Sequence, residues 1–157
     1  MSMTPACVVL DDAGVVYDLH PYDHDPTVES FGLEAADALG VDPEHVFKTL
    51  MATTDTGEFI VAIVPVTHQL DLKALARAAG EKRVRMAAVA DAERSSGYVA
   101  GGISPFGQRK QLRTFLDRSA HALEMIYVSA GRRGLDLSLD PTDLVRLLDA
   151  GVVEIAS

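Results

Sequence analysis

The sequence of residues 97–108 is Gly-Tyr-Val-Ala-Gly-Gly-Ile-Ser-Pro-Phe-Gly-Gln. Four glycines and a proline suit neither a helix nor a strand, because a glycine inside such an element costs roughly 0.5–1 kcal/mol relative to alanine. Glycine is favoured where the backbone takes a positive φ or approaches another group closely. A second glycine-rich stretch, Ser129–Asp136, directly follows the apolar run Met125–Val128. Two such loops predict either a cleft lined by backbone N–H groups or two tight turns in a β-rich domain.

Length and composition indicate one globular domain covering residues 1–157. Hydrophobic residues make up 48% of the chain and charged residues 24%, which is enough for a substantial core. Pro65 interrupts the longest apolar run, so none approaches the roughly 20 residues that a membrane-spanning helix needs. Met1–Ala6 lacks the basic start of a signal peptide, and the single cysteine, Cys7, cannot form an internal disulfide. We expect a cytoplasmic protein with no membrane partner.

The formal net charge of −9 argues against a general nucleic-acid binder, since affinity for phosphates comes mainly from Lys and Arg. Nucleic-acid binding would have to rely on local basic clusters, of which the chain has three: Lys82–Arg85, Arg109–Arg113 and Arg132–Arg133. The first is best explained as an ordinary solvated face. The other two adjoin the glycine-rich stretches and are the stronger candidates.

Periodicity and capping residues predict a mixed α+β fold without regular βαβ alternation. Helices are expected from Thr4 to near Gly14, over 30–39, 71–79 and 88–94, and from Asp140 to Gly151. Strands are expected over 15–19, 47–53, 59–64, 112–116, 123–128, 135–139 and 152–155. The tripeptide Asp55-Thr56-Gly57 predicts a hairpin between the second and third of these strands.

Several common kinds of catalytic site are missing from the sequence. The five histidines have no zinc-ligand spacing, and prolines beside the pair His20 and His24 argue against a shared helix. Cys7 lies among apolar residues and is most simply a core residue. No serine has a nucleophile-elbow sequence, and the loop over 97–107 lacks the Gly-Lys-Ser/Thr ending of a P-loop. We therefore expect no protein nucleophile, no metal and no cofactor.

Several irregular motifs, in order along the chain, carry a resemblance to a known family. They are 20-HPYDHDP-26, 46-VFKTL-50, 65-PVT-67, 69-QLDLK-73, 97-GYVAGGISPFGQ-108 and 127-YVS-129. With them the chain resembles the YbaK family of bacterial Cys-tRNA(Pro) deacylases over nearly its whole length. The resemblance implies a strongly curved mixed sheet, closed or nearly closed into a barrel, with helices packed outside.

The same resemblance implies a function in translation fidelity. Members of the family clear cysteine that prolyl-tRNA synthetase has mistakenly attached to tRNA(Pro), and also act on Cys-tRNA(Cys). The thiol of the esterified cysteine is thought to attack its own ester, which releases tRNA and leaves a cysteine thiolactone. A protein nucleophile is then unnecessary. The expected partners are aminoacyl-tRNA and prolyl-tRNA synthetase, with the synthetase supplying the affinity that an acidic protein lacks.

The resemblance also implies which residues form the site. Lys48, the lysine of the Phe-Lys-Thr-Leu motif, would anchor the acceptor end and help to hold the reacting carbonyl, although an exposed lysine usually has no such role. Thr49 would add a hydrogen bond. The backbone N–H groups of Gly101, Gly102 and Gly131 would face the developing oxyanion or the terminal ribose.

Four further side chains complete the implied site. Ser129 would bind the substrate, and Asp136 would either pair with Lys48, hold the substrate's α-amino group, or face solvent through strand alternation. Tyr22 and Phe31 would form aromatic walls, although Phe31 is otherwise an ordinary core residue.

One departure from the family and two alternative functions stay open. The family often has a second glycine where this chain has Ala130, whose Cβ would narrow the pocket or constrain the loop. One alternative is a deacylase of Ala-tRNA(Pro) or of another small aminoacyl-tRNA, in which water is the nucleophile. The other is a non-catalytic module that binds tRNA or a synthetase.

Overall fold

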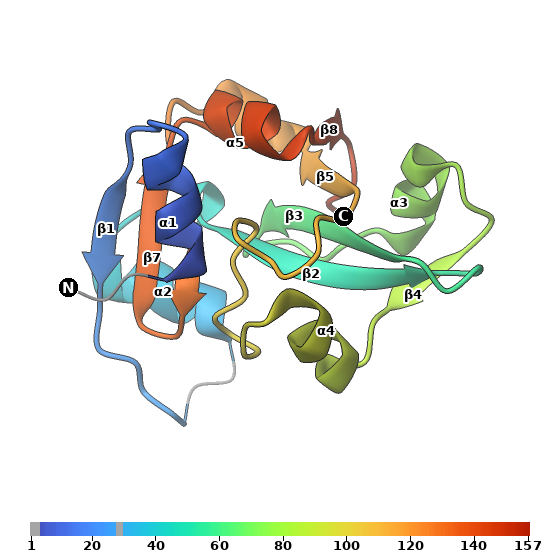
Figure 1. Ribbon diagram of the computed structural model, residues 1–157. Helices are drawn as coiled ribbons and strands as arrows, with labels where there is room; N and C mark the ends of the chain where they lie inside the picture. The colour runs from blue at the N-terminus through green and yellow to red at the C-terminus, as the bar shows by residue number, and fades with distance from the viewer. Residues whose placement is uncertain (1–3, 28–29) are drawn as a thin grey trace.

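The computed structural model of the protein describes residues 4–27 and 30–157 (Figure 1). The helices in these ranges are α1 Pro5–Asp12, α2 Phe31–Leu39, α3 Leu72–Ala79, α4 Val89–Ser96 and α5 Pro141–Leu148, with short 3₁₀ helices at Pro43–His45 and Arg118–Ala122. The strands are β1 Asp18–Pro21, β2 Phe47–Thr54, β3 Phe59–Pro65, β4 Val84–Met86, β5 Thr114–Asp117, β6 Ile126–Arg132, β7 Leu135–Leu139 and β8 Gly151–Val153. The mixed α+β class predicted from the sequence is confirmed.

The strands form two sheets. An antiparallel sheet has the order β1-β7-β6, and a mixed sheet has the order β4-β2-β3-β5-β8, in which β5 is parallel to both β3 and β8. One parallel bridge, between Val46 and Tyr127, joins the start of β2 to β6. The expected closure is therefore absent from the described part of the chain: the two sheets do not form a barrel.

Strand alternation divides the apolar residues between two layers. Phe47, Met51 and Ile63 belong to the main core, which the five-stranded sheet shares with the inner face of the three-stranded sheet, with α1 and with α5. Ala52 and Leu75 belong to a second core, on the side of the five-stranded sheet that α3 covers. Residues at odd positions of β2 therefore face the three-stranded sheet, and those at even positions face the side of α3.

The helix ends follow the sequence signals. Thr4, Ser30, Asp71 and Asp140 are N-caps whose side chains accept a backbone N–H from the first turn. The last helix ends at Leu148 rather than at Gly151, because Asp149 already has a φ of 50° and stops the helix.

Two stretches differ from the expected secondary structure. Residues 84–86, within a cluster interpreted as a solvated face, form the edge strand β4, where Val84 packs against the second core. The second glycine-rich stretch is not a loop, since β6 continues through Ser129 to Arg132 and contains a register shift between those two residues. Its turn is confined to the two residues between β6 and β7.

The first glycine-rich stretch has no helix or strand over residues 97–113, yet much of it is buried. The Tyr98 hydroxyl donates to the Phe106 carbonyl at 2.6 Å, and the Phe106 side chain is fully buried. Gly107 has a φ of 70°, and a Cβ there would lie 2.6 Å from the backbone of Pro5. These residues pack the loop against α1, which fixes its position beside the sheets.

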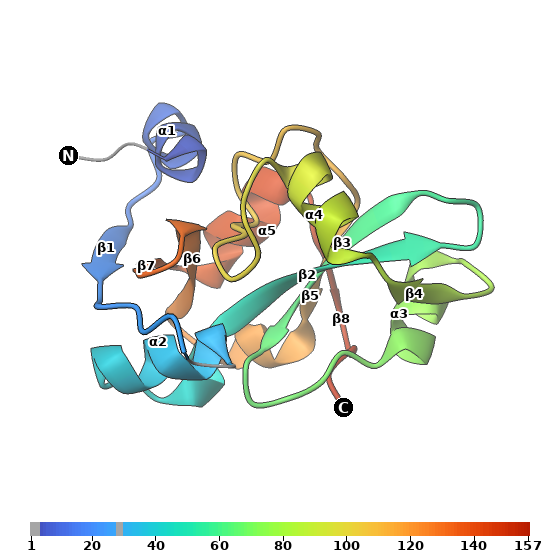
Figure 2. The ribbon, with the colours of Figure 1, turned by 90° about the horizontal axis from the view of Figure 1, so that it is seen from below.

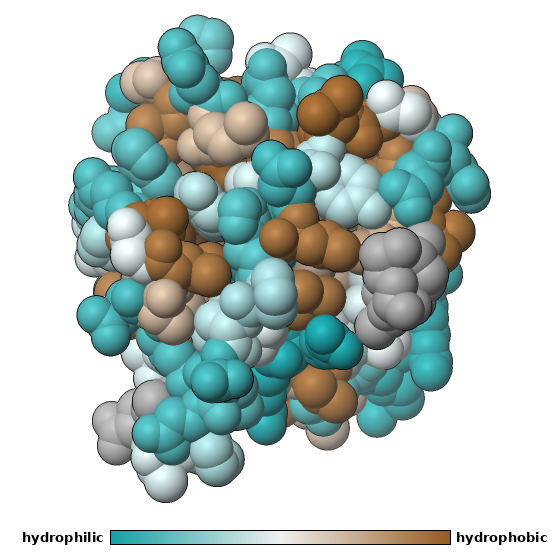
Figure 3. Space-filling view, turned by 90° about the vertical axis from the view of Figure 1, so that its left-hand side faces the viewer, coloured by the Kyte–Doolittle hydropathy of each residue, from teal (hydrophilic) through white to brown (hydrophobic). Residues whose placement is uncertain are grey.

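The face that carries α1, β1 and α2 shows hydrophobic side chains scattered among hydrophilic ones, without one continuous apolar area (Figure 3). Among the described helices, none has both the length and the apolar character that crossing a bilayer requires.

Candidate active site

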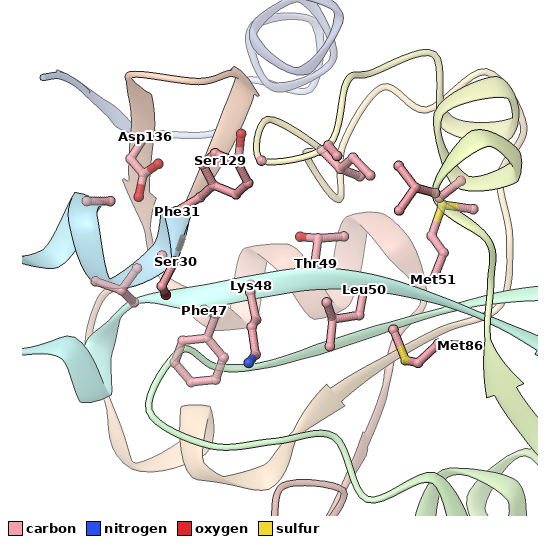
Figure 4. A pocket seen from close by; sticks show the side chains of 18 of the residues that line it. Ser30, Phe31, Phe47, Lys48, Thr49, Leu50, Met51, Met86, Ser129 and Asp136 are labelled. Atoms are coloured by element: carbon pink, nitrogen blue, oxygen red, sulfur yellow. The ribbon is translucent and has the colours of Figure 1, made fainter. Parts of the chain in front are cut away.

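A cavity of about 370 Å³ opens where the three-stranded sheet, α2, α4 and the loop over 97–113 meet the edge of β2 (Figure 4). Of the nine residues proposed from the sequence, seven lie in its wall: Tyr22, Phe31, Lys48, Thr49, Gly101, Ser129 and Asp136. Apolar residues that the sequence did not single out form the other end, namely Leu50, Met51, Met86, Val89 and Ile103. The cavity therefore has a polar end and an apolar end.

A gap in the sheet edge creates the opening. On the side away from β3, β2 pairs with β4 only from Ala52 onward, and it is bridged to β6 only at Val46. Between these points the described strands offer β2 no partner. The Met51 carbonyl accepts from the Ala87 N–H at 3.0 Å on this side. Because backbone groups alternate along an antiparallel strand, the N–H and C=O of Thr49 also point into the gap.

Lys48 lies in the middle of this gap. Its side chain is half-buried, and it forms no ion pair with any residue in the described ranges. Burial lowers the pKa of the Lys48 ammonium. In Figure 4, Lys48 and Leu50 project to one side of β2, while Thr49 and Met51 project to the other. A half-buried cation without a carboxylate partner carries a desolvation cost that an anionic or polar ligand group can offset.

Thr49 supplies an unsatisfied polar atom. Its Oγ1 is buried and has no hydrogen-bond partner within residues 4–27 and 30–157. Buried hydroxyls are nearly always paired, and an unpaired one costs about 1–3 kcal/mol. The hydroxyl lies on the same side of β2 as Ser129 and Asp136 (Figure 4). A ligand in the cavity can satisfy it.

Asp136 belongs to the central strand of the three-stranded sheet, between His20 of β1 and Ser129 of β6. Alternation turns it away from the main core, but it faces the cavity rather than solvent and is only 5% exposed. Burial raises the pKa of its carboxyl to about 7. It forms no ion pair with Lys48, which lies on the other side of β2. The pairing suggested by the sequence is not formed in this structure.

The aromatic walls are held in place by their neighbours. The guanidinium of Arg133 lies 4.8 Å from the centre of the Phe31 ring and donates from Nε to the Ala100 carbonyl at 2.7 Å. A Cβ on Gly101 would lie 2.8 Å from the Phe31 ring, so glycine permits this contact. Burial, reinforced by the charge of Asp136, raises the pKa of the Tyr22 hydroxyl to about 12. The mouth of the polar end is thus built from three segments far apart in sequence.

Gly102 and Gly131 are the two proposed residues that do not line the cavity. The Gly102 N–H donates to the Val99 carbonyl at 2.9 Å, and the Gly131 N–H donates to Ser129 Oγ at 3.1 Å. A Cβ on Gly102 would lie 2.7 Å from the Arg132 backbone. In this arrangement both glycines serve the close packing of the loop against β6, and the Gly131 bond orients the Ser129 hydroxyl.

Ala130 does not narrow the cavity. It is fully buried in the main core, on the face of β6 opposite to Ser129, and its carbonyl accepts from Thr4 Oγ1 at 2.5 Å. The Cβ that distinguishes it from glycine therefore packs toward α1. The departure from the family pattern leaves the cavity wall unchanged.

Sequence reasoning missed the wall residues that belong to no motif. Ser30 was recognisable only as the N-cap of α2, and Met86 and Val89 flank the unpredicted end of β4. α2 reaches the cavity because Gly32 packs directly on Val66, where a Cβ would overlap that side chain. The glycine in an otherwise helical pattern was the available signal for this close approach.

The chain that forms this cavity has known relatives. The family model described as the aminoacyl-tRNA editing domain matches residues 25–147. The chain belongs to this family, as its resemblance to YbaK proteins predicted.

Individual relatives agree with this assignment. The chain is 38% identical over 122 residues to EbsC of Enterococcus faecalis, whose name proposes a Cys-tRNA(Pro)/Cys-tRNA(Cys) deacylase activity, covering 78% of this chain and 74% of EbsC. It is 27% identical over 108 residues to the proline–tRNA ligase of Stenotrophomonas maltophilia, covering 67% of this chain and 19% of the ligase.

Solved structures confirm the fold. A protein described as a candidate trans-editing enzyme for prolyl-tRNA synthetase aligns with a TM-score of 0.84 and 22% identity over 99% of both chains. The protein APE2540 aligns with a TM-score of 0.89 and 23% identity over 98% of this chain and all of APE2540.

Proposed function

We propose that this protein is a trans-editing aminoacyl-tRNA deacylase that removes cysteine from mischarged Cys-tRNA(Pro). Membership of the editing-domain family and the similarity to EbsC support this activity. The cavity of about 370 Å³ lies at the small end of ligand-site volumes, which suits a small aminoacyl group with part of its nucleoside.

One observation carries the choice of nucleophile. Within the described residues, neither a cysteine nor a histidine lines the cavity. Cys7 is fully buried in α1, and its sulfur lies 3.2 Å from Thr4 Oγ1, whose hydrogen goes to the Ala130 carbonyl. The Ser129 hydroxyl accepts the Gly131 N–H, and within the described residues no hydrogen bond joins it to the carboxyl of Asp136, its neighbour across the sheet. We therefore assign the attacking atom to the substrate or to water.

A substrate thiol fits this requirement. A cysteine thiol has a pKa near ~8.5, so a fraction is thiolate at neutral pH, and intramolecular attack reaches effective molarities of about 10⁵–10⁸ M. The sulfur forms a bond to the ester carbonyl carbon, the bond to the ribose oxygen breaks, and the thiol's proton ends on that oxygen. The products are cysteine thiolactone and tRNA with a free terminal hydroxyl.

The cavity's polar groups have distinct proposed roles in this step. The Lys48 ammonium donates to the ester carbonyl or to the departing ribose oxygen, where negative charge develops. Thr49 and Ser129 bind the aminoacyl group from the other side of β2, and Asp136 receives its α-amino group. The rims formed by Tyr22 and Phe31 limit the size of the side chain that enters.

Selection of tRNA(Pro) is proposed to depend on prolyl-tRNA synthetase. The cavity holds only the end of the acceptor strand, and the chain has a net charge of −9, so free tRNA should bind weakly. Proline–tRNA ligases that contain a similar segment keep it within their own chain. A complex with the synthetase would raise the local concentration of the acceptor end in the same way.

A panel of charged tRNAs tests the proposal. Cys-tRNA(Pro) and Cys-tRNA(Cys) should be deacylated at similar rates by the isolated protein, whereas Ser-tRNA(Pro) and Ala-tRNA(Pro) should be at least tenfold slower. Adding prolyl-tRNA synthetase should favour Cys-tRNA(Pro). The Cys7→Ala variant is the control for a protein thiol and should retain activity within twofold.

Each alternative has its own signature in this panel. Equal rates for alanine and cysteine would indicate water as the nucleophile. Binding of tRNA without any deacylation would indicate a non-catalytic module.

A further inference from the structure

The α3–β4 surface, defined here as Lys73 and Arg77 of α3 with Lys82, Arg83 and Arg85, concentrates positive charge on an acidic protein. All five side chains are exposed. Over 71–86 the sequence has these five basic residues against two acidic ones, although the whole chain has a net charge of −9. None of the five forms an ion pair with a described residue.

Other arginines are engaged within the protein. Arg113, a member of a cluster favoured from the sequence, pairs with Glu58 and Glu81 and donates to the Ala79 carbonyl. Arg94, Arg118 and Arg146 each pair with a carboxylate. Arg133 packs on Phe31. Arg109, Lys110 and Arg132 are exposed and form no ion pair in the described ranges, but they belong to separate segments, the loop over 97–113 and the end of β6.

The end of β4 borders the cavity. Met86, the last residue of β4, lines the apolar end, is 44% exposed and pairs with Ala52 of β2. Ala52 lies on the side of the sheet that α3 covers, and Lys48 projects to the same side. Figures 1 and 2 both place α3 and β4 together at one end of the molecule. The basic residues therefore lie on both faces of an edge strand whose last residue lines the cavity on the same side of the sheet as Lys48.

We propose that the α3–β4 surface binds the phosphate backbone of the tRNA acceptor strand and directs its 3′ end into the cavity toward Lys48. The inference rests on the proposed function for the identity of the RNA. Lys73 and Arg77 are four residues apart and share one face of α3. Arg83 and Arg85 are two residues apart in an extended segment, which spaces them by about 7 Å on one side. Because Arg85 pairs with Thr53, that side is the face of β4 away from α3, so the surface extends around the edge of the sheet. Exposed cations without protein partners are the groups that displace counterions from phosphates.

Protection of a sheet edge is the competing explanation. β4 is an edge strand, and basic side chains on such strands prevent association with other edges. The two roles predict different consequences of charge reversal, because only RNA binding makes the surface necessary for a substrate that contains phosphates.

The test compares Arg83→Glu/Arg85→Glu with Arg118→Glu/Arg146→Glu, which makes the same change in net charge away from the α3–β4 surface. Binding of fluorescein-labelled, uncharged tRNA(Pro) is measured by anisotropy over a range of salt concentrations. The first variant should bind at least tenfold more weakly than the control, and the salt dependence of log Kd should fall by about 1–2. Deacylation of Cys-tRNA(Pro) should show a matching rise in KM, whereas 3′-cysteinyl-adenosine, which lacks phosphates, should react within twofold of the wild-type rate.

The outcomes separate this inference from the proposed function. If the protein deacylates none of the substrates but only the first variant loses tRNA binding, the proposed tRNA-binding surface is supported and the proposed deacylase activity is overturned. Equal tRNA binding by the two variants overturns the surface, even where deacylation is normal. If the first variant also loses activity on cysteinyl-adenosine, the substitutions have damaged the cavity, and the milder variant Arg83→Ala/Arg85→Ala is measured instead. Normal turnover of cysteinyl-adenosine with weakened tRNA binding by this variant supports the proposed surface. Unchanged tRNA binding overturns it. If the first variant self-associates but still binds tRNA, the basic residues of β4 serve to protect the sheet edge and the proposed surface is overturned.

Discussion

The two sides of β2 contribute different chemistry to one cavity. On the side of α3, Lys48 is a half-buried cation with no carboxylate partner among the described residues, and Leu50 lies beside it. On the opposite side, Thr49 has an unpaired hydroxyl, and the Ser129 hydroxyl and the Asp136 carboxyl face the same space. Strand alternation alone produces this division.

The gap in the sheet edge allows one ligand to contact both sides. If β4 paired with the whole of β2, the cation and the carboxyl would be separated by a continuous sheet. Because the pairing begins only at Ala52, a ligand can lie across the open backbone of Thr49. Under the proposed function, Lys48 would serve the ester and ribose oxygens, where charge develops, and the other side would hold the aminoacyl group.

The largest effect is expected for Lys48. Lys48→Ala should reduce the single-turnover rate on Cys-tRNA(Pro) by about 10²–10³-fold, the usual effect of losing a donor to a developing oxyanion. Lys48→Met, which keeps an apolar stem, should be as inactive, and Lys48→Arg should also be poor because a planar guanidinium does not replace a compact ammonium. Circular dichroism should be unchanged in all three. Near-normal rates for the alanine and methionine variants would remove the functional distinction between the two sides of β2.

On the other side of β2, the buried Asp136 should make the stability of the protein depend on pH. Its pKa is raised to about 7 by burial, whereas an unfolded aspartate has a pKa near ~3.9. Below about pH 4 both states are protonated. As the pH rises toward 7 the unfolded state releases its proton first, so the free energy of unfolding falls. The shift corresponds to at most about 4 kcal/mol above pH 7, and relaxation around the cavity reduces this to about 1–3 kcal/mol.

Asp136→Asn should remove the fall in the free energy of unfolding between about pH 4 and pH 7, because an amide does not ionise. Urea unfolding should show the variant to be more stable than the wild type at pH 8 and equally stable at pH 4. Its deacylation rate should nevertheless fall at least tenfold, because a neutral amide does not pair with the substrate's α-amino group. A variant that loses stability at both pH values would instead show that the carboxyl is a structural group.

The sequence predicted local features of this site well. The hairpin formed by β2 and β3 follows from its apolar runs and turn residues, and the helix starts at Thr4 and Asp140 follow from capping chemistry. Placing Lys48 and Thr49 on β2 fixed their opposite directions. These features depend on residues close together in the chain.

Long-range features were beyond such reasoning. The parallel pairing of β5 with β3 and β8 joins distant segments, and no local pattern specifies it. Nor does local sequence distinguish a glycine that lines a cavity from one that packs against a strand. Gly101 lines the cavity while Gly102, its neighbour, packs on the backbone of Arg132. The strand β4 was missed because its single core residue, Val84, lies among three basic residues.

The smallest change in deacylation rate is expected on removing the Thr49 hydroxyl. The test is informative because the same substitution should increase stability. Thr49→Val keeps the shape of the side chain and removes a buried oxygen that has no partner in the described structure. The variant should therefore be more stable by about 1 kcal/mol, since the desolvation penalty of that oxygen disappears. If the hydroxyl binds the aminoacyl group, the deacylation rate should fall by about three- to tenfold.

Thr49→Ser is the matched control, because it keeps the hydroxyl and loses a methyl group. It should be less stable than the wild type and close to it in activity, so stability and activity should rank the two variants in opposite orders. Thermal unfolding and single-turnover deacylation measure the two rankings. A valine variant that is both more stable and fully active would show that the hydroxyl does not contact the substrate. Recognition on that side of β2 would then be left to Ser129 and Asp136.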